Sequence, residues 1–145
     1  MIKKVKLILT IFISITFANV ATSQESFFDE ALKMYKEKKY DDAKFLFERN
    51  IVFNPKNVES YLYLAKIYNK KEEQKQEQRN LDTVLLIEPK NEEAILMSMK
   101  IALKKSNYSK VKKLSETFVK VCTKLCGEND KIKESLKNIE SKNES

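Results

Sequence analysis

A short phrase that occurs twice, 34 residues apart, restricts what this chain can fold into. Residues 53–57 read Phe-Asn-Pro-Lys-Asn and residues 87–91 read Ile-Glu-Pro-Lys-Asn. Each copy follows an apolar run and precedes acidic residues. A fixed period of about 20–50 residues is typical of stacked repeats, in which each unit packs against its neighbours. The sequence therefore predicts a repeat protein, and with it a binding role.

The repeated phrase also has a local meaning. The residue before a proline is disfavoured in the α region, so Pro55 and Pro89 each predict the end of a helix. Asn57 and Asn91 are placed to cap the helix that follows. Elsewhere the apolar residues recur at helical spacing, and a single glycine, Gly127, is expected to end the last strongly apolar helix. With two prolines and one glycine, the chain has little material for β-turns, which predicts a nearly all-helical protein.

Residues 1–23 have the pattern of a secretory signal peptide. Three of the first six residues are lysine, an apolar run covers residues 7–18, and Ala21-Thr22-Ser23 follows. The run is shorter than the roughly 20 residues of a spanning helix. We expect export to the bacterial periplasm or to the outside, with cleavage after Ser23 or after Ala21. The alternative is an uncleaved N-terminal segment that anchors the chain in the membrane.

Composition excludes several classes of function. Removal of residues 1–23 leaves 122 residues, enough for one domain, and lowers the net charge from +7 to +4. The chain has only two arginines, so nucleic acid is not an expected partner. It has no histidine, no glycine-rich phosphate loop and no cluster of metal ligands, so we expect no enzyme activity, no cofactor and no metal site.

The 34-residue helix pairs resemble the tetratricopeptide repeat (TPR). In that family an aromatic and small residues let the first helix of a pair nest against the second, and a proline ends the second. The first unit matches at Phe27, Ala31, Tyr40, Ala43, Phe47 and Pro55. The second matches at Tyr61, Leu64, Ala65, Tyr68 and Pro89, but carries Gln74, Glu77 and Leu81 where the family has Tyr, Ala and an aromatic. The third keeps Tyr108, has the larger Ile95 and Val111, and has Thr123 at the place of the closing proline.

The resemblance implies an all-α fold, an α-α superhelix (a right-handed solenoid) of about three TPR-like helix pairs and a C-terminal capping helix. The units are expected at residues 24–57, 58–91 and 92–125, with the cap and a frayed tail at 126–145. The second unit has the degenerate second helix. Because Glu77 stands where a close-packed alanine is expected, this unit should pack more loosely.

In such a stack the first helices line a concave groove, and the 34-residue period relates the residues that face it. They form three sets. The apolar set is Phe28, Leu62 and Leu96; the mid-helix set is Leu32, Lys66 and Lys100; the set at the helix ends is Lys36, Lys70 and Lys104. The two residues of a unit in the first two sets lie four apart, hence on one helical face. A basic groove with an apolar floor suits a protein or peptide partner, in particular an acidic one. Alternatively, the lysines complement the helix dipoles and keep the surface soluble.

One activity of the family does not carry over. Its chaperone-binding members clamp a terminal carboxylate with a specific set of Lys, Asn and Arg side chains. Leu32 and Tyr63 occupy places where that set has Asn, and Met97 one where it has Arg.

The two cysteines, Cys122 and Cys126, leave several alternatives open. On an ideal helix, residues four apart have Cβ atoms about 5–6 Å apart, too far for a disulfide, although an unwound last turn would bring them together. They could instead be buried thiols, take part in redox chemistry, or pair between molecules. Export would place them in an oxidising compartment.

Together these patterns predict an exported TPR module that binds a peptide or protein segment in its groove. The alternatives are a structural subunit or homodimer in a cell-envelope complex, and a membrane-tethered adaptor.

Overall fold

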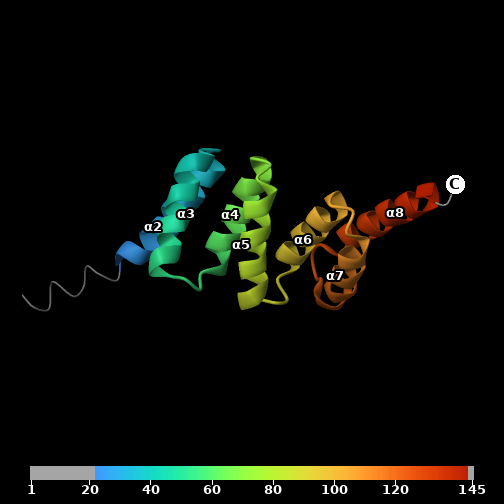
Figure 1. Ribbon diagram of the computed structural model, residues 1–145. Coiled ribbons are helices and arrows are strands. Elements are labelled where there is room, and N and C mark those ends of the chain that lie inside the picture. Colours follow the sequence, from blue (N-terminus) through green and yellow to red (C-terminus); the bar gives the residue numbers. More distant parts are fainter. Residues whose placement is uncertain (1–21, 144–145) are drawn as a thin grey trace, which may run out of the picture. The chain divides into compact units, whose positions relative to one another are not determined.

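The protein is described here by a computed structural model that covers residues 22–143. These residues form seven α-helices and no strand (Figure 1): α2 (Thr22–Lys36), α3 (Tyr40–Phe53), α4 (Val58–Lys70), α5 (Gln74–Ile87), α6 (Glu92–Lys104), α7 (Tyr108–Val121) and α8 (Cys126–Asn143). They belong to two compact units, Met1–Ser60 and Tyr61–Ser145. Residues 1–21 of the predicted signal peptide lie outside the described part. Within that part, no helix combines the length and the apolar content needed to cross a bilayer.

The helix boundaries repeat at the period of the sequence phrase. The helices α4, α6 and α8 begin at intervals of 34 residues, at Val58, Glu92 and Cys126. The same interval separates the starts of α3, α5 and α7, at Tyr40, Gln74 and Tyr108. We call α2, α4, α6 and α8 the first helices and α3, α5 and α7 the second helices. By this register α8 is a first helix without a following second helix in the described chain.

The turn inside each helix pair is built in the same way. At each turn one residue adopts a left-handed conformation, with φ of 62°, 59° and 54° at Lys38, Glu72 and Ser106. The next amide N–H donates to a carbonyl in the last turn of the first helix: from Lys39 to Met34, from Glu73 to Tyr68 and from Asn107 to Ala102. The left-handed region costs an L-residue roughly 1–2 kcal/mol and costs glycine almost nothing.

Glycine should therefore stabilise these turns. We expect Lys38→Gly, Glu72→Gly and Ser106→Gly each to raise the free energy of unfolding by about 0.5–1 kcal/mol. Urea unfolding followed by circular dichroism measures this. Glycine at the preceding residue, as in Lys71→Gly, is the control and should not stabilise. Equal effects at the two positions would contradict the argument.

The predicted helix ends and caps are confirmed. The helices α3 and α5 stop two residues before their prolines, and the residues between, Asn54 and Glu88, have non-helical conformations. The Oδ1 atom of Asn57 accepts from the Ser60 amide at 2.8 Å, and that of Asn91 accepts from the Ala94 amide at 3.0 Å. These caps satisfy amide groups that the first turn of a helix leaves without partners.

The unit Met1–Ser60 is held by the α2–α3 hairpin. Ala31 and Ala43, both fully buried, let the two helix backbones approach closely, and Phe47 fills the space beside them. The ring of Phe28 packs on that of Phe47 with centroids 5.7 Å apart. A buried hydrogen bond of 2.9 Å, from Asn50 Nδ2 to Ser60 Oγ, joins the end of α3 to the start of α4.

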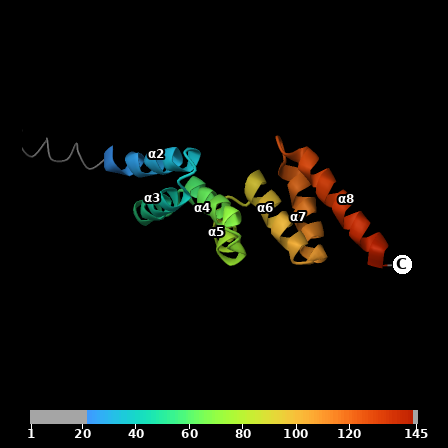
Figure 2. The same cartoon turned by 90° about the horizontal axis from the view of Figure 1, so that it is seen from above.

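In the unit Tyr61–Ser145, helices α6, α7 and α8 lie side by side (Figure 2) and share one core. The fully buried members of that core are Met99, Val111 and Phe118, and α8 adds Ile132 and Leu136. Phe118 has a helical neighbour, Val119, that is 55% exposed, so the apolar and solvent faces of α7 are sharply separated.

The outer side of α8 is polar where α6 is apolar. On α6, three large hydrophobic residues are buried or half-buried: Leu96, Met99 and Leu103. The residues 34 positions later on α8 are all charged and exposed: Asp130, Lys133 and Lys137. A terminal repeat needs such a polar face, because nothing covers it.

The prediction that Gly127 ends a helix is wrong. This residue does not end a helix but lies in the first turn of α8. The preceding helix, α7, already stops at Val121, and Cys122 takes an extended conformation. The reason for the early stop is the loop at residues 122–125, described below.

Candidate functional site

The first helices of the second unit are connected by ion pairs between their side chains. Lys66 Nζ of α4 lies 2.9 Å from Glu93 Oε2 of α6, and Lys100 Nζ of α6 lies 3.3 Å from Glu128 Oε2 of α8. These contacts join α4 to α6 and α6 to α8. They also show that the two mid-helix lysines already have acidic partners within the chain. Lys66 further lies over the ring of Tyr63, at 4.8 Å from its centroid.

The apolar residues of the predicted groove differ in how far their side chains are exposed. Phe28 and Leu62 are half-buried, whereas Leu96 is only 5% exposed and belongs to the core of α6, α7 and α8. Leu96 therefore offers little surface to a partner. Phe28 belongs to the first unit, as do Leu32, which is half-buried, and Lys36, which is exposed.

The remaining two lysines of the predicted groove, Lys70 and Lys104, are exposed. Lys104 is close enough to Glu77 to lower the pKa of that carboxyl by its charge. No group of three or more His, Cys, Asp or Glu side chains that could hold a metal ion gathers anywhere in the described residues.

Glu77, the residue from which looser packing of the second unit was expected, is buried. Its side chain is 3% exposed, and its Oε1 accepts a hydrogen bond of 2.9 Å from Asn69 Nδ2, which joins α5 to α4. Its neighbours on the same face of α5, Leu81 and Val84, are fully buried. Desolvation by burial raises the pKa of Glu77, and the Asn69 hydrogen bond and the Lys104 charge oppose this only in part.

Ionisation of Glu77 should thus cost stability. Because its pKa in the folded protein lies above that in the unfolded chain, its contribution is most favourable below the unfolded pKa and is lost as the pH rises through the folded value. We expect Glu77→Gln to raise the free energy of unfolding at pH 7 by on the order of 1 kcal/mol. The gain should shrink toward acidic pH. Glu134→Gln, at an exposed position, is the control and should change stability little at either pH.

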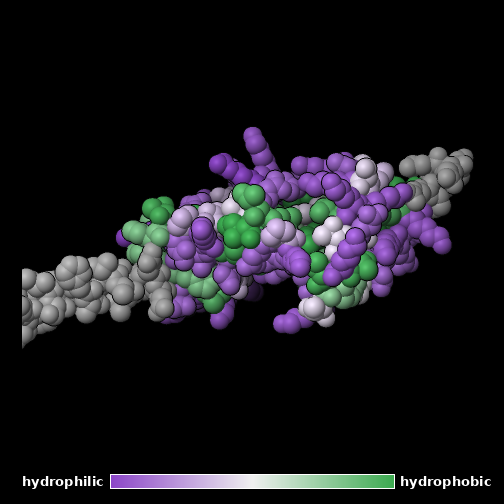
Figure 3. All heavy atoms as spheres, turned by 90° about the horizontal axis from the view of Figure 1, so that it is seen from below, coloured by the Kyte–Doolittle hydropathy of each residue, from purple (hydrophilic) through white to green (hydrophobic). Residues whose placement is uncertain are grey.

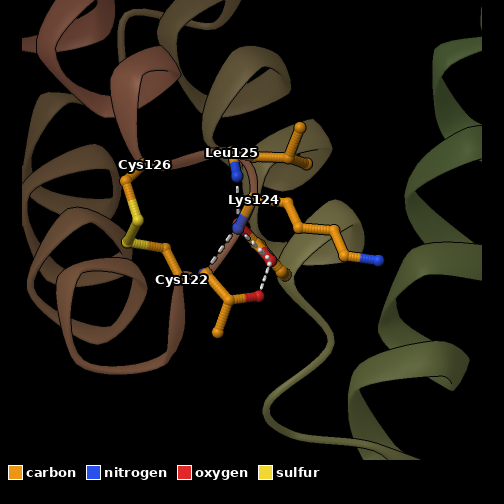
Figure 4. The surroundings of a disulfide bond; sticks show 6 residues. Cys122, Lys124, Leu125 and Cys126 are labelled. Carbon is orange, nitrogen blue, oxygen red and sulfur yellow. Dashed lines mark hydrogen bonds between the residues drawn. A yellow bond between two sulfur atoms is a disulfide. The ribbon is translucent and has the colours of Figure 1, made fainter.

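A disulfide between Cys122 and Cys126 closes the loop between α7 and α8 (Figure 4). Their Cα atoms are 5.3 Å apart. Because α7 ends at Val121 and α8 begins at Cys126, the two cysteines flank the loop instead of sharing one helix. Among the alternatives that the sequence leaves open, the structure has the intrachain bridge.

The carboxylate of Glu92 binds the same loop from α6. Its Oε1 accepts from the amide N–H groups of Thr123 (3.1 Å), Lys124 (3.0 Å) and Leu125, and its Oε2 accepts from the Thr123 hydroxyl at 3.2 Å. In the two preceding units an asparagine caps the first helix, but Leu125 stands at that position here. The amide that such a cap would satisfy, that of Glu128, donates instead to the Leu125 carbonyl at 2.9 Å, and Glu92 accepts from the amides just before α8.

These hydrogen bonds also lower the pKa of the Glu92 carboxyl. Desolvation by burial raises its pKa, but the bonds from Leu125, Lys124 and Thr123 together outweigh this, so the pKa of Glu92 lies below its usual value. The bonds therefore stabilise the folded loop above the unfolded pKa, and their contribution is lost as the pH falls through the folded value. Sequence patterns missed this role because Glu92 and the loop are 31–33 residues apart.

No protein-family model matches the chain, and no curated protein matches it in sequence. Solved structures do match. The Arabidopsis OM64 TPR domain is 17% identical, covers 79% of this chain with 94% of its own length, and has a TM-score of 0.69. The first TPR of Spaghetti (RPAP3), bound to the HSP90 peptide SRMEEVD, is 16% identical, with 78% and 92% covered and a TM-score of 0.67. This chain has a TPR fold.

A third match is the Yersinia enterocolitica type III secretion chaperone SycD, in complex with a peptide of the translocator YopD. It is 14% identical, covers 84% of this chain with 95% of its own length, and has a TM-score of 0.71. These likenesses confirm the prediction of an all-α, α-α superhelix of TPR-like helix pairs.

Proposed function

We propose that this protein is an exported interaction module that holds a peptide or protein segment on the face of α4, α6 and α8. The observation that carries the proposal is the pair of contacts Lys66–Glu93 and Lys100–Glu128, which bring side chains of α4 and α6, and of α6 and α8, together. The peptide-bound RPAP3 and SycD structures support a partner of this kind. Binding requires no catalytic group, and we propose no enzyme activity.

Because Lys66 and Lys100 already have acidic partners, an acidic segment can pair with these lysines only by replacing those partners. An acidic segment would displace Glu93 or Glu128 from its lysine, so each new pair replaces an old one and the net gain is small. The helix-end lysine Lys104, which is exposed, adds attraction. We therefore assign most of the affinity to packing on the half-buried side chains of this face, such as Leu62 and Tyr63.

The test is capture of partners from envelope extracts by the purified protein. We expect Lys66→Glu/Lys100→Glu to reduce capture several-fold, because the face becomes acidic, while helicity by circular dichroism stays unchanged. The control is a variant with reversals on the outside of α7, Lys113→Glu/Lys120→Glu, which should capture as the unmodified protein does. Undiminished capture by the first variant would contradict the proposal.

A swap variant separates binding from folding. Lys66→Glu/Glu93→Lys keeps an ion pair between α4 and α6 but exchanges its charges. If Lys66 contacts the partner, the swap should still impair capture. Full recovery in the swap would assign Lys66 a purely structural role.

Export is the second part of the proposal. The pattern of residues 1–23 supports it, and so does the disulfide, since such bonds persist in oxidising compartments. N-terminal sequencing of the protein recovered from cells is decisive: we expect a start at Gln24 or Thr22, in the periplasm or the medium. A start at Met1 would favour the membrane-tethered adaptor.

A structural role as a subunit or homodimer is a second candidate, which the outer face of α3 favours. Phe45 and Val52 are 61% and 77% exposed there, and Phe53 is 52% exposed while stacking on Phe27. Most of the described surface that Figure 3 shows is hydrophilic. Large apolar side chains that are exposed together on one face commonly mark an interaction surface. Light scattering tests the homodimer; a monomer at high concentration excludes it.

A further inference from the structure

A second surface of the unit Tyr61–Ser145 carries cationic side chains that have no acidic partner among residues 22–143. It is a cleft of about 640 Å³ along α5, closed at one side by Lys105, the residue that follows α6. Its cations are Lys75, Arg79 and Lys105, and its one carboxylate is Asp82. The cleft shares no residue with the predicted groove.

The position of these residues on α5 follows from their spacing. Lys75, Arg79, Asp82 and Leu86 are separated by four, three and four residues, so they lie in a row on one side of the helix. The opposite side of α5 is the buried one, with Glu77 and Leu81. At the C-terminal end of the row, Leu86 is 81% exposed, the largest exposure of any big hydrophobic side chain in the described residues.

The electrostatics differ from those of the first-helix face. There, Lys66 and Lys100 are ion-paired. In the cleft none of the three cations is ion-paired with any carboxylate of the described residues. Asp82 instead accepts a hydrogen bond of 2.7 Å from Gln78 Nε2. An incoming carboxylate would thus meet an excess of positive charge without displacing a partner.

We propose that this cleft binds an acidic segment of a partner protein that also carries an apolar side chain. Arg79, in the middle of the row, donates two parallel N–H bonds to a carboxylate of the segment. Lys75 and Lys105 attract neighbouring carboxylates, and the apolar side chain of the segment covers Leu86. This makes the protein a two-sided adaptor, with a partner on the first helices and another on α5.

The experiment is a fluorescence-anisotropy titration of the full chain with a labelled synthetic peptide of four glutamates and two leucines. A second peptide has glutamine for each glutamate. We expect that only the acidic peptide binds. Its affinity should fall as the salt concentration rises from about 50 to about 200 mM, because salt screens exposed charges; the Debye length is about 8–10 Å at 0.10–0.15 M.

Two variants locate the site. Arg79→Glu/Lys105→Glu should weaken binding about tenfold or more, and Leu86→Ser severalfold, with unchanged helicity; all three residues are at the surface. Lys113→Glu/Lys120→Glu, with the same change of charge on the outside of α7, should bind the peptide as the unmodified protein does. Absence of binding, equal binding of the glutamine peptide, or an equal loss in the Lys113→Glu/Lys120→Glu variant would each overturn the proposal. Because the groove is tested by a different variant, failure here leaves the proposed function standing.

Discussion

Replacing Phe118 with alanine is expected to lower the free energy of unfolding by about 3–5 kcal/mol. Phe118 is fully buried where α6, α7 and α8 meet, among Met99, Val111 and Ile132. Removing its ring loses the transfer free energy of the ring and leaves a cavity between three helices. Urea unfolding followed by circular dichroism measures the change.

Val119 provides the matched control. It is the next residue of the same helix, but it is 55% exposed, so Val119→Ala should change stability by less than about 0.5 kcal/mol. If the two substitutions had similar effects, the assignment of the apolar face of α7 would be wrong. If Phe118→Ala shifts only one of two steps in the unfolding curve, then α6–α8 unfold separately from the rest, as parts of repeat arrays can.

Loss of the Cys122–Cys126 bridge should have the second largest effect. For so small a ring, the chain-entropy relation gives about 2 kcal/mol. We expect Cys122→Ser/Cys126→Ser to lower the free energy of unfolding by that amount and to speed hydrogen exchange at the amides of Thr123, Lys124 and Leu125. The helices should persist, because the bridge and Glu92 hold the same loop independently.

Reductant is the control for this variant. The unmodified protein in dithiothreitol should match the double serine variant, and the serine variant itself should not respond to dithiothreitol. Should both treatments leave stability and exchange unchanged, the bridge would have no role in holding the loop. An additional Glu92→Gln substitution should accelerate exchange at the three amides further.

The helix pairs could be predicted because their signals are local. Pro55 and Pro89 end helices through the conformation of the preceding residue, and Asn57 and Asn91 cap helices through amides three residues away. The later first helices, α6 and α8, start at the same 34-residue period, but the end of α7 at Val121 was not predicted.

Other features depend on contacts between distant residues and left no pattern in the sequence. The pairing of Lys66 with Glu93 requires knowing which sides of α4 and α6 meet. Burial of Glu77 was unexpected because the compensating donor, Asn69, lies on another helix. Gly127 was misread because the early end of α7 goes with a loop bound by a carboxylate 31–33 residues earlier.

The charged outer side of α8 bears on how this protein could be lengthened. A copy of residues 58–91 inserted before Glu92 would keep every boundary in register, and its joints would be those that the chain already uses. A copy appended after Asn143 would instead have to desolvate Asp130, Lys133 and Lys137. For a designer, the molecule is therefore an array that can grow from within and is closed at its C-terminal end.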